Sequence, residues 1–103
     1  RNDYYRNVVY TNDQIQIVLM SIEPGDEIGL ERHQDTTQFF RIEKGVGMAQ
    51  IGNTTYAISD GTALAVPPNT LHNIINASSK HLKLYTIYSP PVHKPGTKEF
   101  SKR

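Results

Sequence analysis

The sequence predicts a single all-β domain, either a barrel or a sandwich, built from about eight or nine short strands. Segments that alternate apolar and polar residues recur along the chain, and alternation with a period of two is typical of half-buried strands. Turn signals rich in Gly, Pro, Asn and Asp separate these segments at intervals of roughly 8–12 residues. No segment shows the apolar period of an amphipathic helix. With 103 residues, the chain has the length of one domain.

The first half of the chain contains four predicted strands. They are residues 8–10, 14–22, 28–33 and 39–43. The second of them alternates at first and then becomes apolar throughout, which is typical of a strand covered on both faces. A Pro-Gly turn at 23–26 precedes the third, and a polar turn at 34–37 follows it. We expect each of these strands to end where its turn signal begins.

The second half contains five further predicted strands, at residues 48–51, 54–58, 63–66, 72–76 and 82–88. The first two flank Gly52-Asn53, a dipeptide that favours a two-residue hairpin turn of type II′. Pro67-Pro68-Asn69 interrupts the pattern before residue 72. Residues 1–94 therefore form one predicted domain. Residues 95–103 are polar and contain Pro and Gly, and we expect them to be a flexible C-terminal tail.

Composition excludes several classes of partner. The formal net charge is +1, so no strong electrostatic attraction to nucleic acid or to an anionic membrane is expected. The apolar runs are far shorter than the ~18 residues of a membrane span. Cysteine is absent, which excludes disulfides and thiolate metal sites and fits a reducing compartment. Because no signal peptide is visible either, we expect a cytoplasmic protein.

Four side chains suited to metal binding are predicted to meet. Glu31 and His33 are two residues apart, so on a strand both point to one face. Gln38 follows the turn at 34–37 and projects from the next strand, while His72 comes from the later segment. Two imidazoles and a carboxylate suit one divalent Zn, Mn, Fe, Ni or Co ion and leave open positions. Gln38 would add a weak oxygen ligand or orient another ligand. The alternative is a hydrogen-bonded polar cluster that binds only water.

The spacing of these residues resembles the two motifs of the cupin family. The first motif corresponds to Gly25, Glu31, His33, Gln38 and Gly45, and the second to Gly61, Pro67, Asn69, His72 and Asn76. The resemblance implies a jelly-roll barrel, also called a double-stranded β-helix. The phrases QFFRIEKGVG, VPPNTLHNIIN and LKLYTIYSPP are similar to small cupins described as mannose-6-phosphate isomerase-like.

Three positions depart from the family pattern. Glu31 stands in place of the first histidine of the family, Gln38 in place of its glutamate, and Asn69 in place of a glycine. The carboxylate therefore stands at one of the motif's histidine positions, and the neutral Gln38 stands at its carboxylate position. These differences concern the identity and affinity of the metal rather than the fold.

The resemblance implies an isomerase that acts on a small sugar or sugar phosphate, with Glu31 as the base that moves a proton between adjacent carbons. Two alternatives remain: a metal-dependent dioxygenase and a non-catalytic binder of sugars or other small molecules. No clear phosphate clamp is visible, because Arg41 is predicted to face away from Gln38. His81 and His93 are predicted at the surface and in an exposed tail. We expect a homodimer that pairs through the edge strand at 8–10.

Overall fold

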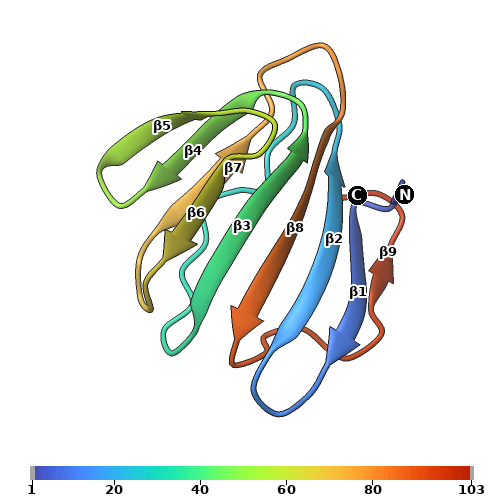
Figure 1. Ribbon diagram of the computed structural model, residues 1–103, viewed down its shortest axis with the longest axis vertical. Helices are drawn as coiled ribbons and strands as arrows, with labels where there is room; N and C mark the ends of the chain where they lie inside the picture. Colours follow the sequence, from blue (N-terminus) through green and yellow to red (C-terminus); the bar gives the residue numbers. More distant parts are fainter. Residues whose placement is uncertain (1, 103) are drawn as a thin grey trace.

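Two antiparallel sheets make up the fold in the computed structural model, which describes residues 2–102 (Figure 1). The strands are β1 (Arg6–Thr11), β2 (Gln16–Ile22), β3 (Thr37–Lys44), β4 (Gly47–Ile51), β5 (Thr54–Ile58), β6 (Ala63–Val66), β7 (His72–Ile75), β8 (Leu82–Ser89) and β9 (Lys98–Glu99). The larger sheet has the order β6-β3-β8-β2-β1-β9 and the smaller sheet β5-β4-β7. The described part of the chain contains no helix of the length and hydropathy needed to span a membrane. The all-β jelly-roll prediction is confirmed.

The core lies between the two sheets because alternate residues of each strand face inward. Partners in an antiparallel ladder share a face, so Met20 of β2, Leu84 of β8 and Ile42 of β3 form one inward row. The smaller sheet contributes Ala49 and Ile74. All five side chains are buried. Burial of a large apolar side chain such as Met20 or Leu84 contributes about 1.5–3 kcal/mol.

The predicted strand at 28–33 is wrong as a continuous strand. Only isolated bridges form there, from Glu27 to Ile75 and from Glu31 to His72. Gly29 between them has a φ of 104°, a conformation outside the β region that interrupts the regular pleat. Its amide donates a 2.8 Å hydrogen bond to the Asn73 side chain instead of to a backbone carbonyl. The segment is nevertheless held against β7.

Part of the segment predicted as a flexible C-terminal tail, residues 97–100, lies along the start of β1. Lys98 and Glu99 of β9 pair with Asn7 and Arg6. The carbonyl of Phe100 also accepts a 3.2 Å hydrogen bond from the Tyr5 amide. The sequence did not reveal this pairing because a strand of two residues has no periodicity of its own. The pairing covers the start of β1 at Arg6 and Asn7, next to residues 8–10, which were predicted to pair with a second protomer.

Candidate metal centre

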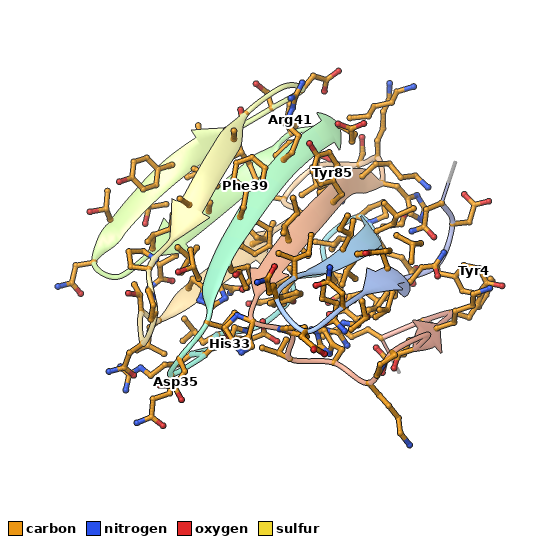
Figure 2. All side chains as sticks on the ribbon, turned by 60° about the horizontal axis from the view of Figure 1, so that its bottom comes forward. Tyr4, His33, Asp35, Phe39, Arg41 and Tyr85 are labelled. Carbon is orange, nitrogen blue, oxygen red and sulfur yellow. The ribbon has the colours of Figure 1, made fainter. Side chains whose placement is uncertain are left out.

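Three donor atoms from separate parts of the sequence converge at one end of the barrel. Glu31 Oε1 lies 3.5 Å from His33 Nε2 and 3.8 Å from His72 Nε2. All three ligand atoms lie within 4.8 Å of one another. Figure 2 shows His33 near the turn that carries Asp35, just before β3. The predicted meeting of the carboxylate with the two imidazoles is therefore observed.

Backbone hydrogen bonds fix these residues against each other. The amide of Glu31 donates to the carbonyl of His72 at 2.9 Å, and the amide of His72 donates back at 3.0 Å. The carbonyl of His33 accepts a 2.8 Å hydrogen bond from the amide of Asn69. Asn69 has a φ of 60°, a left-handed conformation that Asn tolerates better than most residues other than Gly. This explains how Asn69 can replace the family's glycine while the loop still supports His33.

The His72 ring is buried and held in one orientation. Its side chain is 2% exposed, and Nδ1 lies 2.9 Å from the Thr70 carbonyl. Because a carbonyl only accepts, Nδ1 carries the proton and Nε2 presents a lone pair toward Glu31. Burial lowers the pKa of His72, which the Thr70 hydrogen bond and the Glu31 charge partly oppose. The neutral imidazole that metal binding requires is therefore favoured.

Buried atoms without partners support a bound cation. Nε2 of His33, Nε2 of His72 and Oε1 of Gln38 are all buried, and none has a hydrogen-bond partner within residues 2–102. Buried polar atoms are rarely left in this state. Nitrogen and oxygen donors of this kind suit a divalent transition metal. The residues present therefore fit a single metal ion, which Glu31, His33 and His72 would hold.

Gln38 lies on the inner face of β3, where it pairs with Val66 and Tyr88 on the neighbouring strands. It is 1% exposed, and its Nε2 donates a 3.0 Å hydrogen bond to the Thr86 hydroxyl. This bond fixes the amide group and leaves the carbonyl oxygen without a partner in the described part of the chain. Its role as a fourth ligand remains a prediction.

A second layer of residues lies beside the candidate metal ligands. The buried Tyr88 ring meets the His33 ring edge-on, with 5.5 Å between centroids. His93 also contacts this ring, and its Nε2 lies 3.3 Å from the Tyr88 hydroxyl. Burial raises the pKa of Tyr88, and the Glu31 charge raises it further. The phenol therefore remains a neutral hydroxyl.

His93 is half-buried and not exposed as the sequence predicted. The Gln16 side chain forms two hydrogen bonds with the backbone of His93 and so holds it in place. The fully buried Gln16 side chain accepts a 2.9 Å hydrogen bond from the His93 amide. Its Nε2 donates a 2.7 Å hydrogen bond to the carbonyl of the same residue. An amide on an otherwise apolar strand was the only signal in the sequence that could have indicated this contact. His81 is exposed, as predicted.

This chain is similar in sequence to a known family and to several known proteins. The family described as "Cupin domain" matches residues 18–88. Uncharacterized protein L612 of Acanthamoeba polyphaga mimivirus is 45% identical over 100 residues, covering 93% of this chain and 62% of that protein. Uncharacterized protein YrkC of Bacillus subtilis is 41% identical over 103 residues, covering 94% of this chain and 55% of that protein. The chain thus spans less than two thirds of the length of either relative.

Two further matches concern a structure and a named enzyme. The crystal structure of BH2720 from Bacillus halodurans has a TM-score of 0.95 at 40% identity, covering 97% of this chain and 80% of that one. Mannose-1-phosphate guanylyltransferase RfbM of Salmonella typhimurium is 25% identical over 83 residues, covering 81% of this chain but only 17% of the enzyme. The similar region is therefore a small part of that enzyme.

Proposed function

Because this chain belongs to the cupin domain family, we propose that it binds one divalent transition metal and isomerises a small sugar or sugar phosphate. The convergence of Glu31 Oε1, His33 Nε2 and His72 Nε2 carries this proposal. Three protein ligands on one side of an ion leave positions open for a substrate. When bound, the ion would supply Lewis-acid polarisation of a substrate carbonyl.

Glu31 is the proposed base. Its Oε1 faces both imidazoles, which leaves the second carboxylate oxygen to accept a proton from one carbon and return it to the next. Its side chain is 27% exposed, so a substrate entering from solvent can contact it.

A carbohydrate substrate is supported by the resemblance to isomerase-like cupins and by the similarity to an enzyme named for mannose 1-phosphate. The proposal concerns this domain, since the relatives are longer proteins. We further propose that it works in the cytoplasm as a homodimer.

A dioxygenase is the second candidate, and one observation favours it. Two histidines and one carboxylate on one face also make the ligand set of non-haem Fe(II) oxygenases, and Glu31, His33 and His72 match that set. Binding of a small molecule without catalysis is the third candidate.

Elemental analysis of protein purified without chelator or a histidine tag is the first test. We expect about one equivalent of a transition metal per chain. Mn or Zn, together with conversion of mannose 6-phosphate to fructose 6-phosphate, would support the isomerase. Fe together with oxygen uptake would support the dioxygenase. A protein that contains no metal and takes up none on titration would overturn both enzymatic candidates and leave the binding module.

A further inference from the structure

The segment that carries Glu31 forms a β-bulge against β7. Two isolated bridges join this segment to β7, from Glu27 to Ile75 and from Glu31 to His72. Between the bridges lie three residues on one side, 28–30, and only two on the other, 73–74. One extra residue on one side of an antiparallel pair is a β-bulge, which re-aims the side chains that follow it. Gly29, with a φ of 104°, lies within this bulge.

The bulge decides in which direction Glu31 points. On a regular strand, Ile28 and Leu30 would face one side and Glu31 the other, because side chains alternate. Here Ile28 belongs to the buried core and is 8% exposed, whereas Leu30 is 60% exposed. The Glu31 carboxylate lies 3.8 Å from Nε2 of the buried His72. Ile28 and Glu31 therefore both face the interior, which a strand without a bulge would not allow.

The Asn73 side chain holds the bulge against β7. Its Oδ1 accepts a 2.8 Å hydrogen bond from the Gly29 amide, and its Nδ2 donates to the Glu27 carboxylate. Asn73 is 4% exposed, and it follows His72 on β7. A bulge takes a residue out of the backbone ladder, and an amide shielded from water needs another acceptor. One buried side chain therefore fixes the residues on both sides of Ile28.

The two imidazoles of the site are held by other contacts. His72 is part of β7 itself, and its Nδ1 is fixed by the Thr70 carbonyl. The carbonyl of His33 accepts a hydrogen bond from the Asn69 amide. Loss of the bulge would therefore displace the Glu31 carboxylate more than it displaces either imidazole.

We propose that Asn73 is a positioning residue of the candidate metal centre. By holding the bulge at Gly29, it keeps the Glu31 carboxylate directed toward the two imidazoles. The proposal rests on the proposed function, since it assumes that Glu31 binds a metal together with His33 and His72. Asn73 is not one of the motif residues. Its role follows from the register of the bridges to β7, which the alternation of the sequence does not show.

The test is the zinc affinity of Asn73→Ala, measured by isothermal titration calorimetry in the wild-type background and in Glu31→Ala. In the wild-type background, we expect about tenfold weaker binding, as is typical when the support behind a metal ligand is lost. In the Glu31→Ala background, Asn73→Ala should change the affinity by less than about twofold, because the carboxylate that it positions is absent. General loosening of the fold would lower the affinity equally in both backgrounds.

Gln50→Ala is the matched control. Gln50 carries the same amide group and pairs with Asn73, but it lies on β4, one strand further from the bulge. Its removal should leave the zinc affinity unchanged. Rescue is the second control. Asn73→Asp combined with Glu27→Gln keeps an acceptor for the Gly29 amide and reverses the hydrogen bond between the two side chains, so this protein should bind zinc more tightly than Asn73→Ala.

A glycine variant keeps the test available if Asn73→Ala does not fold. Gly29→Ala strains the bulge directly, and Gly25→Ala is its control. Both glycines have a positive φ and no atom within 4 Å of a built Cβ, so the added methyl group strains only the backbone. Zinc affinity should fall for Gly29→Ala and stay near the wild-type value for Gly25→Ala. Equal affinities of the two variants would overturn the proposal.

Hydrogen exchange of the metal-free protein separates this proposal from the metal centre. Asn73→Ala should speed exchange of the Gly29 amide about fivefold, the effect of one lost hydrogen bond. Unchanged exchange would overturn the proposal, as would an unchanged zinc affinity of Asn73→Ala or an equal loss of affinity in both Glu31 backgrounds. Faster exchange in Asn73→Ala, with a wild type that takes up no zinc, would overturn the metal centre and leave Asn73 only the role of holding the bulge.

Discussion

At the scale of single residues, hydrogen bonds to neighbouring groups outside the site orient two of its side chains. His72 donates through Nδ1 to Thr70, and Gln38 donates through Nε2 to Thr86. The remaining acceptors are Nε2 of His72 and Oε1 of Gln38. Both atoms are buried, and neither has a hydrogen-bond partner among the described residues. Ligands that are oriented before the ion arrives lose little conformational entropy when it binds.

Removal of either imidazole should abolish high-affinity metal binding. We expect His33→Ala and His72→Ala to weaken zinc binding by about 100-fold or more, because fewer than three strong ligands would remain. Isothermal titration calorimetry measures this affinity, and far-UV circular dichroism checks that the β structure persists. His81→Ala is the control, since His81 is exposed and lies outside the site. Wild-type affinity in both site variants would disprove the assignment.

His93 should make the metal-free protein less stable at acidic pH. Burial lowers its folded pKa from the ordinary value of 6.5, so below that value the unfolded chain binds the proton first. Stability from this group is complete above pH 6.5 and is lost as the pH falls through the lower folded pKa. The neighbouring charged and titratable groups are Arg6, Glu31, His33, Tyr88 and Glu99.

Urea denaturation at about pH 7.5 and about pH 5 tests this expectation, because the slope for one proton is at most about 1.4 kcal/mol per pH unit. The wild type should lose more of its free energy of unfolding on acidification than His93→Gln does. Equal losses would show that His93 titrates alike in the folded and unfolded chains.

At the scale of elements, local patterns predicted most strands, and tertiary contacts account for the misses. Alternation and turn residues located the strands that carry Gln38 and His72. The predicted strand around Gly29 is not formed because the φ of 104° at Gly29 breaks the extended backbone. The alternation of apolar and polar residues in the sequence does not reveal this break. His93 and β9 were missed because their partners, Gln16 and β1, are distant in sequence. The meeting of Glu31, His33 and His72 was predictable because spacing within each motif is local.

Gly47 at the start of β4 should not tolerate a side chain. A Cβ there would lie 2.4 Å from the carbonyl oxygen of Ile75, the last residue of β7. We expect Gly47→Ala to lower the free energy of unfolding by about 1–3 kcal/mol through overpacking. It should also weaken zinc binding, because β7 carries His72.

The control is Gly52→Asn. Gly52 has a φ of 58° and no atom within 4 Å of a built Cβ, and Asn accepts this conformation. Urea denaturation should place it within about 1 kcal/mol of the wild type. If Gly47→Ala were as stable as this control, the prediction would be wrong. β4 and β7 could then move apart without lowering the free energy of unfolding.

At the scale of the whole molecule, the outer face of the larger sheet carries an apolar cluster that is incompletely covered. Leu19 pairs with Tyr85. Ile17 pairs with Ile87 on β8, which in turn pairs with Phe39 on β3. These outward side chains are half-buried. The sequence predicted cover on both faces of β2, and a second copy of the chain would provide it. Since β9 already covers part of the edge of β1, this face is the better candidate for the proposed dimer contact.

Sedimentation velocity should therefore detect a dimer of the wild type. Leu19→Lys should shift it to monomer, because a charge would replace an apolar contact at the interface. Tyr56→Lys serves as the control, since Tyr56 is 44% exposed on β5 of the other sheet. A monomeric wild type at all concentrations, or a dimeric Leu19→Lys, would count against this interface.

The contact between the two ends of the described chain has a consequence for its connectivity. The Tyr5 amide donates to the Phe100 carbonyl, and the rings of Tyr4 and Phe100 meet edge-on with 6.0 Å between their centroids. The backbone thus nearly closes on itself beside β1 and β9 (Figure 1). A short linker could join these ends, and the chain could be reopened at the exposed Asn53 in the β4–β5 hairpin. The domain therefore meets the geometric condition for circular permutation, and a permuted chain should still bring the candidate ligands Glu31, His33 and His72 together.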